Sequence, residues 1–178
     1  EFCENNPDQT ILTNTISVKN ATYIANELNI PLVFISTAGV FDGQKDFYDD
    51  WDVPNPINQY GKSKYLAELF VQKYSVKSII CRAGWMMGGG PKKDKKFVQK
   101  ILKQIKDGKN ELYIVEDKAG TPTYTYDFAE NLKIILENNL WGLYNLVGQG
   151  EANRLDVANQ ILEILELKNK IKVIQVNS

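Results

Sequence analysis

The chain contains no histidine among its 178 residues, and its only cysteines are Cys3 and Cys81. The missing imidazole excludes Ser-His-Asp and Cys-His catalysis as well as histidine-ligated metal sites. Two thiols are too few for a zinc or iron–sulfur ligand set, so no metal site is expected. Because the two thiols stand far apart in the sequence, they favour a reducing compartment, and we expect a cytoplasmic protein, with a single disulfide as the alternative.

Long apolar runs and an excess of charge of either sign are also missing. No run approaches the roughly 20 apolar residues of a membrane-spanning helix, and no signal peptide is visible. The formal net charge of −1 gives no reason to expect nucleic acid or a membrane as a partner. The lysines at 92–96 are interpreted as a solvated helix start, with a phosphate contact as the alternative. The chain starts without Met, so we interpret it as a fragment or a processed product.

Helical and strand patterns alternate along the chain. Apolar residues recur at helical spacing in the segments 8–28, where Asp8 is the expected cap, 57–74, 97–105, 126–138 and 153–167. Short apolar runs typical of strands covered on both faces occupy residues 31–35, 76–81, 111–115, 143–147 and 171–176. Residues 120–123 are expected to form a turn. The alternation predicts an α/β fold with a mostly parallel sheet and helices on both faces.

Two irregular segments between these elements hold candidate ligand-binding residues. Residues 38–56 make a long acidic and aromatic loop, and a loop of this length in a compact domain usually serves a function. Gly88, Gly89 and Gly90 follow one another, so they could let the backbone approach a ligand or simply form a flexible turn. No Gly-Lys-Ser/Thr follows them, which excludes a phosphate loop.

Tyr60 and Lys64 lie four residues apart in the segment that Asn58 is expected to cap, so they share one face of the predicted helix. An ammonium group beside a phenol favours the phenolate, lowers the phenol pKa and makes a better proton donor. Upstream, an apolar strand ends in Ser36 and Thr37, at the carboxyl end where open α/β sheets bind ligands. The Thr37 hydroxyl could there hold a carbonyl oxygen against the phenol.

This pair alone is weak support for a catalytic site. The chain has 9 tyrosines and 21 basic residues, all of them lysines except Arg82 and Arg154, so one Tyr-x-x-x-Lys spacing is expected by chance. A solvated helix face is therefore the competing interpretation, and the surrounding motifs have to decide between the two.

Several motifs occur in the order typical of one enzyme family. They are Asn14 with Asn20, Ile35-Ser36-Thr37 with Val40-Phe41-Asp42-Gly43, Pro56 with Tyr60-Gly61-x-Ser63-Lys64-x-x-x-Glu68, Arg82-x-x-Trp85, Gly120-Thr121-Pro122-Thr123 and Gly142-Leu143-Tyr144-Asn145. In this order they resemble the extended short-chain dehydrogenase/reductases, and among them the dTDP-4-dehydrorhamnose reductase type of sugar-nucleotide enzyme. The resemblance covers nearly the whole chain and favours a catalytic role for Tyr60.

The resemblance implies reduction of a 4-keto group on a nucleotide-linked deoxysugar, with NADP or NAD as the cofactor. Tyr60 then gives a proton to the carbonyl oxygen, Lys64 lowers the Tyr60 pKa and binds the nicotinamide ribose, and Thr37 bonds the carbonyl. The cofactor side of the implied site consists of Ser36, Tyr60, Lys64, Ala83 and Gly84, and the substrate side of Thr37, Trp85 and Lys96. For Trp85, a place in the core is the alternative.

The resemblance also implies an architecture. Residues 1–90 correspond to the second half of a doubly wound, Rossmann-like parallel sheet with the catalytic helix. Residues 91–178 correspond to a small substrate-binding lobe intertwined with this half-domain. The resemblance also implies that the complete protein forms a homodimer. The glycine-rich turn that follows the first strand of such a sheet is not in these 178 residues, so the chain resembles a reductase that begins late.

One departure from the family leaves alternatives to the reductase. Ala38 and Gly39 stand where the family usually has Asp-Tyr after the catalytic hydroxyl. An epimerase or dehydratase of the same superfamily is the first alternative, because it would share the Thr, Tyr and Lys. A non-catalytic binding or regulatory subunit built on the same fold is the second.

Overall fold

The computed structural model describes residues 2–94 and 96–177, and the contacts between residues divide the chain into two units. The first unit consists of the chain up to Gly84 together with Glu130–Leu146. The second consists of Trp85–Ala129 together with the chain from Val147 onward. The expected boundary at residue 90, between a half-domain and a lobe, stays a prediction about folding units.

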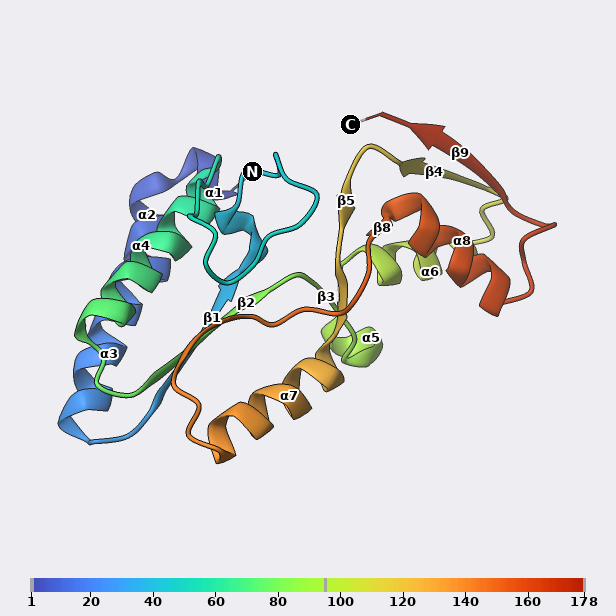
Figure 1. Cartoon of the computed structure of the whole chain (residues 1–178). Helices are drawn as coiled ribbons and strands as arrows, with labels where there is room; N and C mark the ends of the chain where they lie inside the picture. The colour runs from blue at the N-terminus through green and yellow to red at the C-terminus, as the bar shows by residue number, and fades with distance from the viewer. Residues whose placement is uncertain (1, 95, 178) are drawn as a thin grey trace. The chain divides into compact units, whose positions relative to one another are not determined.

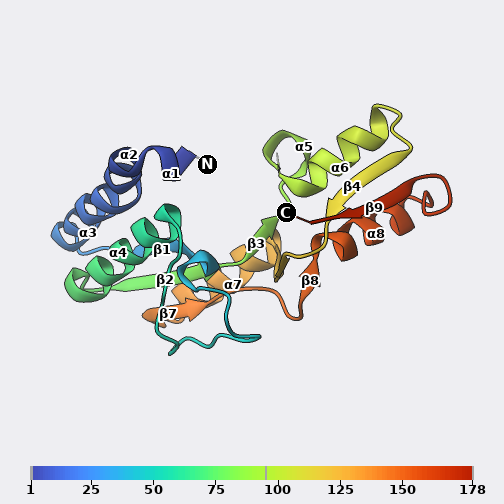
Figure 2. The same cartoon turned by 90° about the horizontal axis from the view of Figure 1, so that it is seen from above.

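A parallel sheet forms the centre of the first unit. Its strands are β1 (Leu32–Thr37), β2 (Ser78–Ala83) and β7 (Gly142–Asn145), in the order β1-β2-β7, and Figure 2 shows them side by side. Since these strands run in the same direction, their carboxyl ends meet at one edge of the sheet, where ligands bind in open α/β folds.

Helices connect and flank these strands. The N-terminal helical run consists of α1 (Phe2–Asn5), α2 (Pro7–Ile11), a π-helical turn at Leu12–Ile16 and α3 (Ser17–Glu27). The helix α4 (Gln59–Tyr74) lies between β1 and β2 in the sequence, and α7 (Thr125–Glu137) precedes β7. Figure 1 shows α3 and α4 side by side, and an edge-to-face contact between the rings of Tyr23 and Phe70, with centroids 5.6 Å apart, joins them.

Both faces of β2 are buried. Ile80 packs with Phe34 of β1 and with Ala67 and Val71 of α4 in one hydrophobic cluster. Ile79 and Cys81 flank Ile80 in the strand, so they point to the opposite face, and both are fully buried. The expected α/β fold, with a parallel sheet covered on both faces, is confirmed.

In the described part of the second unit the strands pair two by two. β3 (Trp85–Met87) pairs in parallel with β6 (Pro122–Tyr124), β4 (Glu111–Val115) in parallel with β9 (Lys172–Val176), and β5 (Ala119–Gly120) antiparallel with β8 (Ala152–Asn153). The helices between them are α5 (Gly90–Lys93), α6 (Phe97–Lys106) and α8 (Arg154–Ile164).

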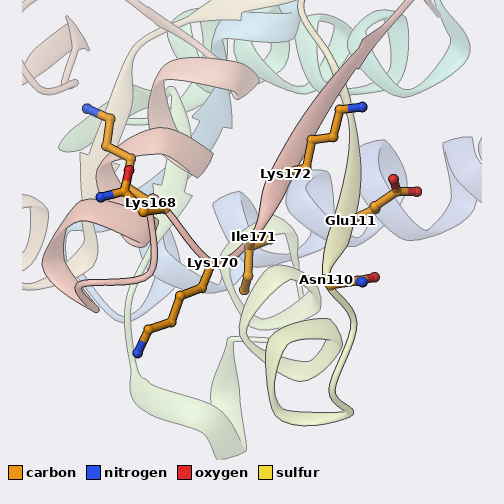
Figure 3. Close-up of a pocket in the computed structure, with 7 residues that line it drawn as sticks. Asn110, Glu111, Lys168, Lys170, Ile171 and Lys172 are labelled. Atoms are coloured by element: carbon orange, nitrogen blue, oxygen red, sulfur yellow. The ribbon is translucent and has the colours of Figure 1, made fainter.

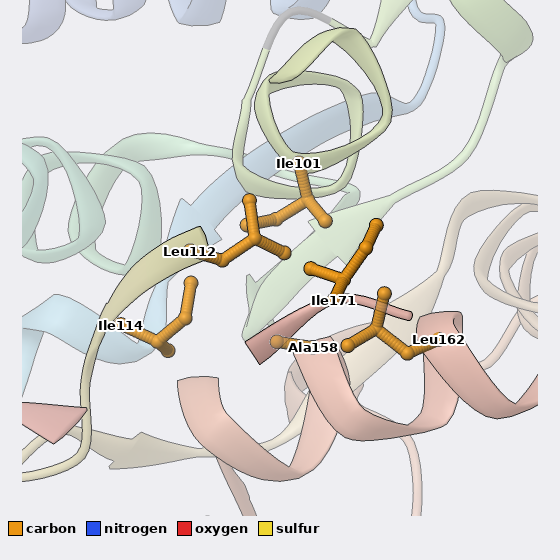
Figure 4. Close-up of a cluster of buried hydrophobic side chains, with 6 residues drawn as sticks. All are labelled: Ile101, Leu112, Ile114, Ala158, Leu162 and Ile171. Atoms are coloured by element: carbon orange, nitrogen blue, oxygen red, sulfur yellow. The ribbon is translucent and has the colours of Figure 1, made fainter. Parts of the chain in front are cut away.

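The second unit has a hydrophobic cluster of its own, in which side chains from α6, β4, α8 and the residue just before β9 point toward one another (Figure 4). Its buried members are Ile101, Leu112, Ile114, Ala158, Leu162 and Ile171. Burying one aliphatic side chain of this size stabilises a fold by about 1.5–3 kcal/mol. The cluster therefore fixes α6 and α8 against the β4–β9 pair.

Most elements lie where the sequence predicts them, and the exceptions have local causes. Asp8 is not the cap of the first long helix, because Asn6 holds the N-cap position and Pro7, which has no N–H to satisfy, begins α2. Asn58, in contrast, caps α4 as expected: its side-chain oxygen accepts the N–H of Gly61 at 2.8 Å.

The expected turn at residues 120–123 is wrong. Gly120 pairs with Ala152 across β5 and β8, and Pro122–Tyr124 pairs with β3. These strands are only two or three residues long, so they leave no alternating pattern in the sequence. Within the described ranges, no helix combines the length and the apolar character needed to cross a membrane.

Candidate active site

The carboxyl ends of β1 and β2 bring together several residues that the sequence predicts for the site. In the parallel register, Ser36 lies beside Arg82 and Thr37 beside Ala83, and Gly84 follows directly. Ala83 is buried, so a small side chain and then a glycine end this strand.

The start of α4 lies close against the turn after β1. A Cβ added to Gly61 would lie 2.2 Å from the carbonyl oxygen of Gly39, a distance that no real Cβ adopts, so only glycine permits this approach. The helix can therefore begin directly beside the 3-10 turn at Ala38–Val40. This close approach places Tyr60, one residue before Gly61, next to Thr37.

The Tyr60 phenol lies beside the Thr37 hydroxyl, and this neighbour lowers the pKa of the phenol. The Thr37 oxygen accepts the N–H of Gly39 at 3.1 Å, which fixes its direction. Burial has the larger effect and raises the pKa of Tyr60 above its ordinary value of 10.0. The Tyr60 side chain is nevertheless 41% exposed, so the phenol can meet a ligand.

Lys64 lies one helical turn after Tyr60, but its ammonium group has a different partner. Nζ donates to the carbonyl oxygen of Ile35 at 2.7 Å and lies 4.2 Å from the centroid of the Phe34 ring. Burial lowers the Lys64 pKa, while the negative charge of Glu68 opposes this shift. The direction expected for the Tyr60 pKa, a lowering by Lys64, is therefore wrong for this arrangement, because burial of the phenol dominates and the ammonium is directed at β1.

Behind these residues, Glu68 of α4 forms a buried charge network. Its carboxylate accepts hydrogen bonds from the Ser36 hydroxyl and from Nε and Nη2 of Arg82, the latter at 2.8 Å. All of these side chains are buried, and Glu68 is fully so. Ser36 therefore points toward α4 and is engaged with Glu68, whereas Thr37 points to the phenol.

A second set of contacts fixes the first turns of α4 from the N-terminal helical run. Asn14 donates to the Ser63 hydroxyl at 3.0 Å, and Thr15 donates to the Ser63 carbonyl at 2.8 Å. Ser63 in turn donates to the carbonyl of Tyr60 at 2.7 Å. Asn14 and Thr15 belong to the π-helical turn, a local widening of the helix that often occurs at functional sites.

Of the supporting residues in these two networks, the sequence predicted only Ser36 as part of the site. Glu68 and Arg82 each stand between apolar neighbours in the sequence, and this is the signal that could have identified them. A charged residue in such a position is buried only with a partner, so two of opposite charge indicate a buried ion pair. No sequence signal reveals the π-helical turn, because its residues have ordinary helical spacing.

Trp85 and Lys96, the remaining predicted substrate residues, belong to the second unit. Trp85 begins β3, and a Cβ on Gly120 would lie 2.5 Å from the indole Cε2, so the ring lies directly on the backbone of β5. The ring is half-buried. Lys96 is exposed just before α6, and its N–H donates to the Asp94 carboxylate at 2.9 Å.

A further open cavity of about 440 Å³ lies in the second unit, at the start of β4 and β9 (Figure 3). The residues that line it are Asn110, Glu111, Lys168, Asn169, Lys170, Ile171 and Lys172. None of them is a predicted site residue. Among the residues that the structure describes, no cluster of three or more Cys, Asp and Glu side chains could hold a metal ion.

Comparison with known proteins agrees with the motif order. The family model described as "RmlD substrate binding domain" matches residues 1–178, the entire chain. The chain belongs to this family. The spore coat polysaccharide biosynthesis protein SpsK of Bacillus subtilis is 33% identical to this family member over 170 residues, which are 95% of the chain and 58% of SpsK.

Two solved structures of family relatives have the same fold. The dTDP-4-dehydrorhamnose reductase of Yersinia enterocolitica superposes with a TM-score of 0.94 at 32% identity and covers 100% of the chain. The reductase of Bacillus anthracis in complex with NADP gives 0.92 at 29% identity over 99%. The chain spans 62% and 61% of these two proteins. The expected kinship with extended short-chain dehydrogenase/reductases of the dTDP-4-dehydrorhamnose reductase type is confirmed.

Proposed function

We propose that the whole protein reduces a keto group, the 4-keto group of a nucleotide-linked deoxysugar, with NADPH or NADH as the reductant. The observation that supports this best is the position of Tyr60 beside the Thr37 hydroxyl at the carboxyl end of β1, one helical turn from Lys64. The names of the family relatives, which are reductases of dTDP-4-dehydrorhamnose, point to the same substrate class.

Tyr60 is the proton donor in this proposal. Its raised pKa keeps the phenol protonated at neutral pH, so it holds the proton that the carbonyl oxygen takes up as the carbon is reduced. Thr37 lies beside that phenol and would orient the same carbonyl oxygen. Lys64 serves the cofactor in this proposal, because its ammonium is directed at the Ile35 carbonyl at the end of β1 and not at the phenol.

The residues at the ends of β1 and β2 are compatible with a nicotinamide cofactor. The cofactor, when bound, supplies the hydride. Ala83 and Gly84 leave the carboxyl end of β2 without a bulky side chain, and the Lys64 ammonium has no carboxylate within ion-pairing distance among the described residues. Lys64 and Tyr60 would bind the ribose hydroxyls. Ser36, engaged with Glu68, supports the site from behind.

On the substrate side we assign Trp85 to the sugar and Lys96 to a phosphate. The half-exposed indole offers a flat apolar face, and the lysine is free to reach an anion. Gly39, at the position where the family usually has a tyrosine, leaves the Thr37 hydroxyl bonded to a backbone N–H. We therefore expect this chain to differ from its relatives mainly in which sugar-ring substituents it accepts.

The test is a product assay with the whole protein, dTDP-4-keto-6-deoxyhexoses and NADPH or NADH. A reductase oxidises one equivalent of cofactor for each 4-hydroxy product formed. Epimerised or dehydrated sugar without net cofactor oxidation would replace the proposal with the epimerase or dehydratase alternative. Binding of the sugar nucleotide with no product at all would favour a non-catalytic subunit.

A further inference from the structure

Arg154, the first residue of α8, lies against two aromatic rings of the second unit. Its guanidinium carbon is 5.9 Å from the centroid of the Trp85 ring and 5.8 Å from that of the Phe97 ring. A guanidinium that stacks on aromatic faces keeps its N–H groups available at the edge of its plane. The contacts therefore restrict the side chain without using its hydrogen-bond donors.

The backbone around Arg154 is fixed as well. Asn153 caps α8, and the capping box is complete, because Asn153 and Asp156 exchange hydrogen bonds between side chain and backbone at 2.8 and 2.9 Å. β8 pairs Ala152 with Gly120, the glycine on which the Trp85 ring lies. Arg154 thus directly follows β8, whose partner strand β5 contains the glycine next to the Trp85 ring. Phe97 packs against the hydrophobic cluster of this unit.

The two arginines of the chain differ in how their charge is used. Arg82 is buried and makes a two-pronged bond to Glu68. Arg154 is half-buried, and no carboxylate oxygen of the described residues lies within 4 Å of its guanidinium. The nearby carboxylate of Asp156 is occupied by the helix cap. A guanidinium that is partly desolvated, oriented and without a carboxylate partner can bind an anion by two parallel hydrogen bonds.

We propose that Arg154, whose guanidinium lies over the Trp85 ring, binds the diphosphate of the nucleotide-linked sugar. The inference rests on the proposed function and names the group of the substrate that this part of the chain recognises. The planar fork of donors matches two phosphate oxygens, and the adjacent indole offers a face for the sugar or base that the diphosphate joins. Arg154 is a binding residue here and takes no part in the proton transfer.

The experiment measures binding to the protein without turnover. Thymidine and thymidine diphosphate are titrated calorimetrically into the parent, Arg154→Met and Arg154→Lys. Met keeps an unbranched apolar side chain beside the two rings and removes the charge and the donors. We expect the parent to bind the diphosphate more tightly than the nucleoside, Arg154→Met to weaken diphosphate binding by about 10- to 100-fold, the range of a hydrogen bond to a charged group, and Arg154→Lys to restore part of it.

Nucleoside binding should stay the same in all variants, because the proposed contact is made only with phosphate. Lys106→Met, which removes an exposed charge from α6 of the same unit, is the matched control and should change neither affinity. Circular dichroism shows whether each variant is folded. If Arg154→Met fails to fold, the Arg154→Lys protein still decides, because it keeps the charge but loses the two-pronged geometry.

Four results would overturn the assignment. The first is equal affinity of the parent for nucleoside and diphosphate, and the second is an unchanged diphosphate affinity in Arg154→Met. The third is an equal loss of affinity for both ligands in Arg154→Met, which would make Arg154 only a support for Trp85. The fourth is a loss of affinity for NADP⁺ in Arg154→Met in place of a loss for the nucleoside diphosphate. The last result would mean that the phosphate belongs to the cofactor. A protein that binds the diphosphate through Arg154 but reduces no keto sugar would contradict the proposed reaction alone.

Discussion

The Glu68 carboxylate accepts hydrogen bonds from Nε and Nη2 of Arg82, at 3.1 and 2.8 Å, in a place where both side chains are buried. Removing one partner of such a pair leaves an uncompensated charge and typically costs about 3–5 kcal/mol. We therefore expect Arg82→Met to lower the free energy of unfolding by that amount in a urea titration. The double variant Glu68→Leu with Arg82→Met should recover much of the loss, since it buries no charge.

The exposed pair of Lys133 and Glu137 on α7, 3.9 Å apart, provides the matched control. Lys133→Met should change the free energy of unfolding by less than about 1 kcal/mol, as is usual for surface ion pairs. If Arg82→Met costs no more than Lys133→Met, the buried network contributes nothing to stability.

The pKa of Asp42 reports whether the long loop after β1 keeps its internal hydrogen bonds. Its pKa is lowered to about 2 from 3.8, first by the hydrogen bond from Tyr48 and then by that from Asn55. Because the folded-state pKa is the lower one, the stabilisation by this carboxylate is fully present above pH 3.8 and is lost as the pH falls through about 2. We expect Tyr48→Phe to move the Asp42 pKa back toward 3.8.

Carboxyl-carbon NMR titration of Asp42 measures this shift directly. Tyr126→Phe removes an exposed phenol from the other unit and should leave the Asp42 titration unchanged. An Asp42 pKa that is the same in the Tyr48→Phe protein and its parent would show that the loop does not hold this bond in solution.

The sequence predicted the long elements well because each of them satisfies its own pattern. α4 has an N-cap at Asn58 and an apolar stripe, and β4 is predicted with the bounds that the structure has. β1 ends at Thr37 as predicted, whereas β2 continues two residues beyond the predicted end at Cys81, to Ala83. The placement of Thr37 beside Ala83 is set by the pairing of the two strands, which the sequence did not predict.

The parts that the sequence did not predict depend on contacts between distant residues. β5 and β8 are two residues long and owe their existence to a pairing of Gly120 with Ala152. The direction of the Tyr60 pKa depends on how far the phenol is buried and on which acceptor the Lys64 ammonium finds. Helical spacing places two residues on one face, but it does not fix where their side chains point.

By themselves, these 178 residues are expected to bind NADPH only weakly. They do not contain the glycine-rich turn that follows the first strand of a dinucleotide-binding sheet, the feature that supplies backbone donors to a dinucleotide pyrophosphate. Fluorescence titration with NADPH measures the affinity. A dissociation constant in the low micromolar range would contradict this expectation.

The whole protein is expected to form a homodimer through α3 and α4. Beside the contact of Tyr23 with Phe70, these helices expose Leu66, Leu69 and Tyr74, an apolar face that a symmetric partner could cover with the same residues. Sedimentation at about 10 μM, well above ordinary dimer dissociation constants, should give the dimer mass. Leu69→Lys should shift the protein to monomer, while Ile164→Lys, at an exposed position of α8, should not.

The catalytic proposal depends on Tyr60, and its variants separate chemistry from packing. Tyr60→Phe in the whole protein removes the proton donor and keeps the ring, so we expect kcat to fall by about 10²–10⁴-fold with little change in thermal stability. Thr37→Val removes one hydrogen bond from the carbonyl and should cost less. Lys64→Met should act chiefly by raising the KM for the cofactor, because the ammonium is directed at the end of β1, where the ribose is proposed to bind, and not at the phenol.

The pH profile gives the sign of the Tyr60 contribution. A proton donor works in its protonated form, and burial raises the Tyr60 pKa above 10.0, so the parent's kcat should stay level through neutral pH and decrease only in strongly alkaline solution. In Tyr60→Phe this alkaline decrease should be absent from the residual activity. Tyr126→Phe, which removes an exposed phenol elsewhere, should keep the parent's profile. If Tyr60→Phe retains kcat within about threefold of the parent, far outside the range for a lost general acid, Tyr60 is not the proton donor. Tyr60 and Lys64 would then only share a solvated face of α4, without a role in catalysis.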